Sequence, residues 1–345
     1  MNPTSSPLSD LGVGFPVVAA PMAGGPTTVD MVLAASRAGA LGFLAAGYKT
    51  PDAIEAEIAR VRSAAIPFGV NVFVPNSVPV DPAAYRTYAV AMQREADRFG
   101  VTLPGEPVED DDHFRAKIDL LLSDPVPVVS FTFGMPDSGV IKALRAAGTT
   151  VVQTVTSSAE AELAAEAGAD MLAAQSSDAG GHYGTFTPER PGAPLPVIDL
   201  VDQIKTHVTL PVIAAGGLAT ADDVARVIHA GAHAAMVGTV LLRSTESGAS
   251  ATHRAALADP ARTETVVTRA FTGRPARGLR NTFIDTYEAH APLGYPAIHH
   301  LTSPLRKAAA AAGQPDFVHL WAGTGYRHAA EESTTPILTR LAADV

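Results

Sequence analysis

The chain has 345 residues, of which 47% are hydrophobic and only 17% charged, so it can bury a large core and is not a disordered chain. Its net charge is −10, no basic cluster stands out and aromatic residues make up only 6%, so we expect no nucleic-acid partner. The absence of cysteine excludes disulfides, cysteine metal ligands and cysteine nucleophiles. The sequence shows neither a signal peptide nor a run of about 20 apolar residues, so we expect a cytoplasmic protein with no membrane partner.

Eight short apolar runs, rich in β-branched residues, recur along the chain. Most are continuous rather than alternating, which is typical of parallel strands buried on both faces. The predicted strands are Pro16–Ala20, Leu41–Ala46, Phe68–Phe73, Val128–Phe133, Val151–Val155, Met171–Gln175, Val212–Ala215 and Ala234–Val237. Eight strand–helix repeats favour closure, so we predict an α/β fold of the (β/α)8 TIM barrel type, with an open doubly wound sheet as the alternative.

Helical periodicity fills many of the gaps between these strands, and glycine often ends the helix. The clearest predicted helices are Thr28–Arg37, Pro51–Ser63, Ser138–Ala147, Ser158–Ala167 and Thr220–Ala230. Glycine tolerates the left-handed conformation that closes a helix, and the predicted helix-ending glycines are Gly39, Gly148, Gly168 and Gly231.

Two gaps and the C-terminal third are too long for one helix each. The gap between Phe73 and Val128 holds a helix-like stretch, Tyr85–Phe99, and the acidic segment GEPVEDDD, so we expect an insertion over one barrel rim near residues 75–127. The gap after Gln175 begins with a long Gly/Pro-rich loop, on the face where barrel active sites lie. We therefore expect a barrel over residues 1–243, a small, mostly helical accessory segment over 244–313, and a C-terminal segment, 314–345, that returns to the barrel.

The seventh and eighth predicted strands both run into glycine turns. Gly216-Gly217 follows the seventh strand, and Thr220 with Asp223 predicts a capping box at the start of the next helix. Gly238-Thr239 follows the eighth strand. Either turn alone is explained as a tight turn, but the pair in these two loops indicates the phosphate-binding site that this fold commonly carries.

Other strand ends carry small residues and amides. The first strand ends in Ala20-Pro21-Met22-Ala23-Gly24-Gly25, which lets a flat ring lie against the main chain, although a plain turn would use the same residues. Asn71 and Gln175 lie in apolar runs at the ends of the third and sixth strands, so we expect partly or fully buried amides that need partners. Two such amides can hydrogen-bond the polar edge of a flavin ring.

His182 is the predicted catalytic residue. It lies in Ala179-Gly180-Gly181-His182-Tyr183-Gly184, just beyond the sixth strand, where glycines let the imidazole approach a ligand and histidine is the natural proton acceptor near neutral pH. We expect solvated or structural roles for His207, His229, His253, His299 and His300. We expect no metal site, because no pair of histidines or carboxylates has ligand spacing on a predicted helix, and the acidic run 110–113 is interpreted as a solvated loop.

A set of motifs resembles the nitronate monooxygenase family, formerly called 2-nitropropane dioxygenase, in order and at plausible spacing along nearly the whole chain. The matching elements are Ala-Pro-Met-Ala-Gly-Gly at 20–25, Gly-Val-Asn-Val-Phe at 69–73, Ser-Phe-Thr-Phe-Gly at 130–134, Ala-Gly-Gly-His at 179–182, Ala-Ala-Gly-Gly at 214–217, Gly-Arg-Pro-Ala-Arg-Gly-Leu at 273–279 and Trp-Ala-Gly at 321–323. Ala-Gly-Gly-His is shared with flavin-dependent enoyl reductases, and the two C-terminal elements favour nitronate monooxygenase.

The resemblance implies an enzyme that binds flavin mononucleotide (FMN) and uses O₂ to oxidise an alkyl nitronate, such as propionate 3-nitronate, to a carbonyl compound and nitrite. The implied cofactor-binding residues are Met22, Asn71, Gln175, Gly180, Gly181, Gly216, Gly217, Met236, Val237, Gly238 and Thr239. His182 is the implied active-site histidine, and Thr132, Tyr183 and Trp321 are expected on the substrate side. Several relatives carry Arg after the histidine where this chain has Tyr183, so the resemblance does not fix the natural substrate.

Three alternatives remain at this point. The first is an FMN-dependent NAD(P)H reductase, of the enoyl or quinone reductase type, on the same barrel. The second is a barrel that binds a phosphorylated metabolite without a flavin, and the third is a non-catalytic flavin-binding protein. Sequence also leaves two roles open for His182, a base toward a neutral nitroalkane or a cation toward a nitronate, and it does not indicate an oligomeric state.

Overall fold

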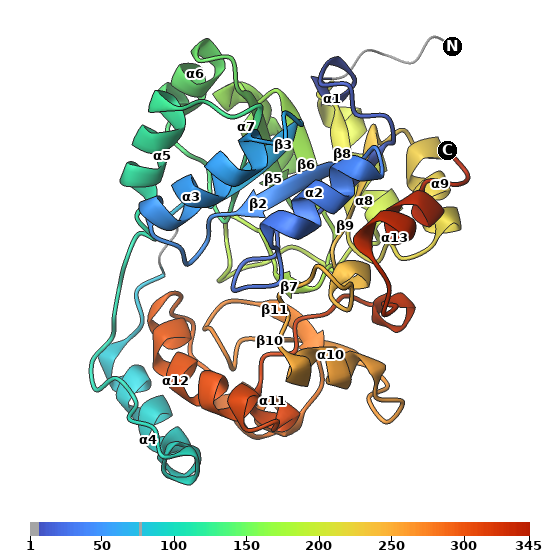
Figure 1. Ribbon diagram of the computed structural model, residues 1–345. Helices are drawn as coiled ribbons and strands as arrows, with labels where there is room; N and C mark the ends of the chain where they lie inside the picture. Colours follow the sequence, from blue (N-terminus) through green and yellow to red (C-terminus); the bar gives the residue numbers. More distant parts are fainter. Residues whose placement is uncertain (1–6, 76–77) are drawn as a thin grey trace.

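The computed structural model describes residues 7–75 and 78–345, and its centre is a closed barrel of parallel strands (Figure 1). The barrel strands are β1 (Val17–Ala19), β2 (Leu41–Ala45), β3 (Phe68–Phe73), β4 (Val128–Thr132), β5 (Thr150–Val155), β6 (Met171–Gln175), β8 (Val212–Ala215) and β9 (Ala234–Val237). They pair in chain order, and β1 pairs with β9 to close the ring. This confirms all eight predicted strands and the TIM barrel, and it excludes the open sheet.

Helices surround the barrel, as the periodicity predicted. They are α2 (Val29–Arg37), α3 (Pro51–Arg62), α5 (Phe114–Ser123), α6 (Ser138–Ala146), α7 (Ser158–Ala167), α8 (Val197–His207), α9 (Ala221–His229) and α13 (Thr334–Leu341), with the short α1 (Pro7–Asp10) near the start of the described chain. Thr220 and Asp223 form the predicted capping box on α9, and Gly168 ends α7 with a φ of +94°. Helix α5, which we did not predict, packs between α3 and α6.

A second lobe covers the carboxyl ends of the strands (Figure 1). It contains α4 (Pro82–Phe99), α10 (Ala251–Ala258), β10 (Thr265–Thr268), β11 (Ala276–Leu279), α11 (Thr282–Tyr287), η2 (Glu288–His290), α12 (Ala297–Ala311), η3 (Pro315–Phe317) and η4 (Tyr326–His328). The short helix η1 (Thr239–Leu241) follows β9 and packs in the barrel core. The lobe's own core joins Tyr85 and Tyr88 of α4 to Phe271, Phe283 and Leu301. Helix α4 packs against α12, although five barrel strands (β4, β5, β6, β8 and β9) lie between them in the sequence. No helix in these described ranges is long and apolar enough to span a membrane.

A small antiparallel sheet joins the lobe to the barrel. Its strand order is β10-β11-β7, where β7 is the two-residue strand Gly181–His182. Ala276 of β11 lies opposite His182, so the loop in which we expected His182 contains a strand that is held by the lobe. The β10–β11 hairpin was not predicted either, because Ala-Arg-Gly-Leu and the half-exposed Thr-Val-Val-Thr carry a weak strand pattern.

Candidate active site

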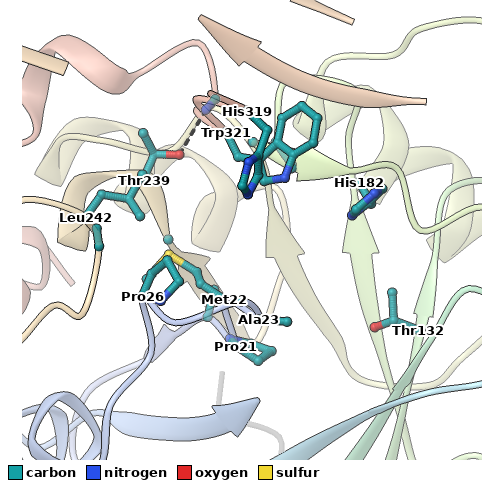
Figure 2. Close-up of a pocket in the computed structure, with 18 of the residues that line it drawn as sticks. Pro21, Met22, Ala23, Pro26, Thr132, His182, Thr239, Leu242, His319 and Trp321 are labelled. Carbon is teal, nitrogen blue, oxygen red and sulfur yellow. Dashed lines mark hydrogen bonds between the residues drawn. The ribbon is translucent and has the colours of Figure 1, made fainter. Parts of the chain in front are cut away.

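A cavity of about 520 Å³ lies between the strand ends and the lobe, within the range of small-molecule and cofactor sites. The predicted site residues that line it are Met22, Asn71, Thr132, Gln175, Gly180, Gly181, His182, Gly216, Gly217, Met236, Gly238, Thr239 and Trp321. In Figure 2 the His182 and Trp321 rings lie above Met22 and Thr132, which come from the strand ends. Val237 and Tyr183 do not line the cavity: Val237 is buried in the barrel wall, and the Tyr183 hydroxyl donates to the Thr156 carbonyl at 3.4 Å.

The two glycine turns present unused backbone donors to this cavity. Within the described ranges, the backbone N–H groups of Gly217, Gly238 and Thr239 have no hydrogen-bond acceptor, although all three residues line the cavity. Just before α9, the Asp223 carboxylate accepts from the backbone N–H groups of Ala219 and Thr220. The three unpaired N–H groups of the two turns are available to an anionic group.

The Ala-Gly-Gly and Trp-Ala-Gly elements meet backbone to backbone. A Cβ atom on Gly180 would lie 2.5 Å from the Gly323 nitrogen, so only glycine permits this approach. The Thr324 N–H donates to the Asp178 carbonyl at 3.1 Å, and the Gly323 N–H donates to the Thr239 hydroxyl at 2.9 Å (Figure 2). Three segments that are distant in the sequence are thus fixed together at one side of the cavity.

Both predicted amides have protein partners. Asn71 is buried, and its Nδ2 donates to the hydroxyls of Ser130 at 2.9 Å and Thr132 at 3.0 Å. Gln175 donates through Nε2 to the His182 carbonyl at 3.2 Å and accepts from the Gly184 N–H at 2.7 Å. Gln175 therefore positions the backbone on both sides of Tyr183 and fixes the segment that carries His182.

The His182 imidazole lies in a ring of aromatic side chains. Its centroid is 5.5 Å from those of Phe133 and Tyr295 and 5.6 Å from that of the Trp321 ring. Burial, reinforced by the positive charges of Arg274 and Arg306, lowers the pKa of His182 to about 3. The imidazole is therefore neutral at neutral pH, which is the form that accepts a proton.

The comparisons with known proteins agree along the whole chain. The model of the nitronate monooxygenase family matches residues 5–344. The chain belongs to the nitronate monooxygenase family, and it is therefore an enzyme of an oxidoreductase family. A probable nitronate monooxygenase from Staphylococcus aureus (strain Newman) is 37% identical over 338 residues, which cover 96% of this chain and 94% of that protein.

Two solved structures extend this comparison. A nitroalkane oxidase from Streptomyces ansochromogenes is 46% identical, with a TM-score of 0.93 over 98% of this chain and 97% of that one. FabK from Thermotoga maritima, 24% identical with a TM-score of 0.76 over 99% of this chain and 96% of that one, shares the fold.

The lobe of this nitronate monooxygenase family member contributes cavity residues that the sequence did not reveal. They are His253, His299, Arg306, Lys307 and His319. His253 is buried and His299 stacks on Tyr48 at 4.4 Å, so neither is a solvated residue, and both line the cavity. On sequence, His253 and His299 are ordinary residues of two helices, α10 and α12. Only the packing of these helices over the strand ends brings the two histidines to the cavity.

Charge in the cavity is of one sign. Among the described residues that line it, none is aspartate or glutamate, and Arg306 and Lys307 are its cations. Arg306 is 4% exposed and donates to the Thr302 hydroxyl and the His299 carbonyl, both at 2.9 Å, but it pairs with no carboxylate in the described chain. Burial lowers its pKa only to about 10, so it stays charged and favours an anionic ligand.

The acidic run near 110–113 is not simply a solvated loop, which corrects our interpretation. Asp112 pairs with the buried Lys117 at 2.7 Å and accepts from the Tyr48 N–H at 2.9 Å. Asp110 contacts Nε2 of His300 at 2.5 Å. Asp112 thereby holds Tyr48, whose backbone has a φ of +66° and whose ring lines the cavity.

Proposed function

We propose that this enzyme uses FMN and O₂ to oxidise alkyl nitronates, and the neutral nitroalkanes from which they form, to a carbonyl compound and nitrite. The observation that carries the proposal is the imidazole of His182, enclosed by aromatic rings, in a cavity that is lined by no described carboxylate and by a buried cation, Arg306. Burial lowers the pKa of this imidazole, which favours its neutral form. Family membership and the 46% identity to a nitroalkane oxidase support the same reaction class.

The residues of the cavity fit FMN. The partnerless N–H groups of Gly217, Gly238 and Thr239 suit a phosphate group, which accepts several hydrogen bonds. Asn71 at the end of β3 and the Pro21-Met22 turn at the end of β1 would lie along a flat ring. The redox capacity of the reaction, uptake of electrons from the substrate and their return to O₂, is what a bound FMN supplies.

The side chains of the lobe and of β7 would act on the substrate. A nitroalkane is neutral and its nitronate is an anion, so a neutral His182 can take the α-proton while Arg306 and Lys307 stabilise the negative charge that develops. Trp321, Phe133 and Tyr295 surround His182 and exclude water. Tyr183 replaces the arginine of several relatives, so in a carboxylated substrate such as propionate 3-nitronate the carboxylate would depend on the α12 cations instead.

An oxygen electrode tests this proposal. We expect the purified enzyme to consume O₂ and release nitrite with preformed ethylnitronate, and we expect NADH neither to drive O₂ uptake nor to bleach the flavin at a comparable rate. Fast bleaching by NADH with no nitronate turnover would overturn the proposal and place the enzyme with the NAD(P)H reductases.

A further inference from the structure

We propose that Thr272 is a positioning residue that fixes the tautomer of His182, so that Nδ1 of the imidazole is the atom that receives the α-proton of a nitroalkane. This inference rests on the proposed function. Thr272 is 1% exposed and lies in the turn that connects β10 and β11, two strands of the sheet that also contains His182. Its hydroxyl oxygen is 2.9 Å from Nε2 of His182.

The acceptor that receives the threonine proton sets the direction of this hydrogen bond. A threonine hydroxyl has one proton, and two acceptors lie within reach of it: the Arg274 carbonyl at 3.2 Å and Nε2 of His182 at 2.9 Å. The Arg274 carbonyl can only accept, and no other described group donates to it, so we assign the threonine proton to this carbonyl. In this arrangement Thr272 offers His182 only a lone pair, and Nε2 of His182 is the donor. A neutral imidazole has a single N–H, so Nδ1 keeps an unprotonated lone pair.

Nδ1 is also the nitrogen that is open to the substrate. No described residue forms a hydrogen bond with it, and it is not among the fully buried polar atoms that lack a partner. Since His182 lines the cavity, Nδ1 is left accessible from that side. The β7–β11 pairing and the surrounding Phe133, Tyr295 and Trp321 rings hold the imidazole in this orientation.

The proton transfer needs no further reactant. The Nδ1 lone pair forms a bond to the α-hydrogen of R₂CH–NO₂, and the C–H electron pair becomes part of the C=N bond of the nitronate R₂C=NO₂⁻. The imidazole becomes an imidazolium, so charge is conserved across the pair. Thr272 does not touch the substrate in this step; it keeps the acceptor nitrogen free.

The variant Thr272→Val removes the hydroxyl with little change in shape. The Nε2–H of His182 would then be buried without an acceptor, so the proton should move to Nδ1 and the lone pair should turn away from the substrate. We expect nitroethane turnover to fall at least about tenfold, with KM and the rate on preformed ethylnitronate changed by less than about threefold. The conservative variant Thr272→Ser should restore nitroethane turnover.

Nitrogen NMR of protein labelled with ¹⁵N-histidine tests the tautomer directly and needs no turnover. The His182 signals are identified by their loss in His182→Asn, and we expect Nε2 protonated and Nδ1 unprotonated in the wild type and Thr272→Ser. A protonated Nδ1 in the wild type overturns the inference, as does a Thr272→Ser variant that loses nitroethane turnover. If Thr272→Val fails to fold, these two measurements still decide. Absence of turnover on both substrates in the wild type would instead overturn the proposed function, and the NMR result would stand separately.

Discussion

The two walls of the cavity differ in the chemistry that they contribute. Up to Thr239, the described lining residues come from the strand ends and include no Asp, Glu, Lys or Arg; they are mainly small residues, amides, hydroxyls and glycine turns. From Gly248 onward, the lining residues come from the lobe and the segment after it, and they include His253, His299, Arg306 and Lys307.

We infer from this difference that the two walls have different functions. Under the proposed function, small residues and free backbone donors would let a planar, phosphorylated cofactor approach closely. The imidazoles and the two cations, of which Arg306 is buried, would act on a substrate whose charge changes during the reaction. His182 lies where the two walls meet, because its strand follows β6 of the barrel but pairs with β11 of the lobe. Variants on either wall should therefore fail in different ways, and the predictions below test that separation.

The largest effect is expected at the boundary itself. His182→Asn should lower turnover of a neutral nitroalkane by roughly 10²–10⁴-fold, because the base is lost, while much of the activity on the preformed nitronate should remain. Oxygen-electrode rates on nitroethane and ethylnitronate with the two proteins measure this. A larger loss on the nitronate would assign His182 a cationic role instead, and near-wild-type rates on both substrates would remove it from the site.

On the barrel wall, Gly217→Val should lower FMN affinity at least tenfold, or about 1.4 kcal/mol, without unfolding the barrel. Gly217 has a φ of +74°, and an added Cβ would lie 3.3 Å from Cβ of Asp178, so the turn and its N–H groups must shift. Gly148→Val is the matched control, since Gly148 has a φ of +87° and no neighbour near an added Cβ. Flavin titration of both variants is the measurement, and equal affinities would show that the phosphate lies elsewhere.

On the lobe wall, Arg306→Met should raise the KM for ethylnitronate about five- to tenfold and that for nitroethane much less, because only the nitronate is charged before reaction. The fold should tolerate the change, since Arg306 has no carboxylate partner to leave unpaired in the described chain. Arg86→Met removes an exposed arginine of α4 and controls for net charge. Equal changes in KM for the two substrates would contradict a role for Arg306 in binding the charged nitronate.

The smallest effect concerns pH. A base must be neutral to act, and the pKa of His182 is lowered to about 3, so its acceptor form persists until the pH approaches that value. We expect kcat/KM for nitroethane to change by less than about twofold between pH 8 and pH 5. A fall centred near about 6.5, the ordinary histidine value, would show that the imidazole is solvated during turnover.

The sequence predicted the barrel wall of the cavity better than the lobe wall. The strands, the Thr220–Asp223 capping box and the glycine turns follow from patterns within a few neighbouring residues, and the structure confirms the strands and the cap. His299 and Arg306 gave no such signal, because on sequence they are ordinary residues of one amphipathic helix, α12. They line the cavity because α12 packs across the strand ends, and this packing depends on contacts between residues that are far apart in the sequence.

The strand β7 illustrates the same limit on a smaller scale. Its glycines and histidine indicated a flexible catalytic loop, but two residues are too few to produce a strand pattern. Pairing with Ala276 and Arg277, much later in the sequence, makes the strand. Thr272 likewise has no local signal, and only this sheet brings its hydroxyl to the imidazole.

Identifying the cofactor tests the central claim most directly, because the division between the walls requires FMN on the barrel side. The protein is purified, its cofactor is released by heat, and the supernatant is separated by chromatography beside FMN and FAD standards. We predict a yellow protein that releases FMN and retains no covalently bound flavin. Release of FAD, or of no flavin at all, would contradict the account.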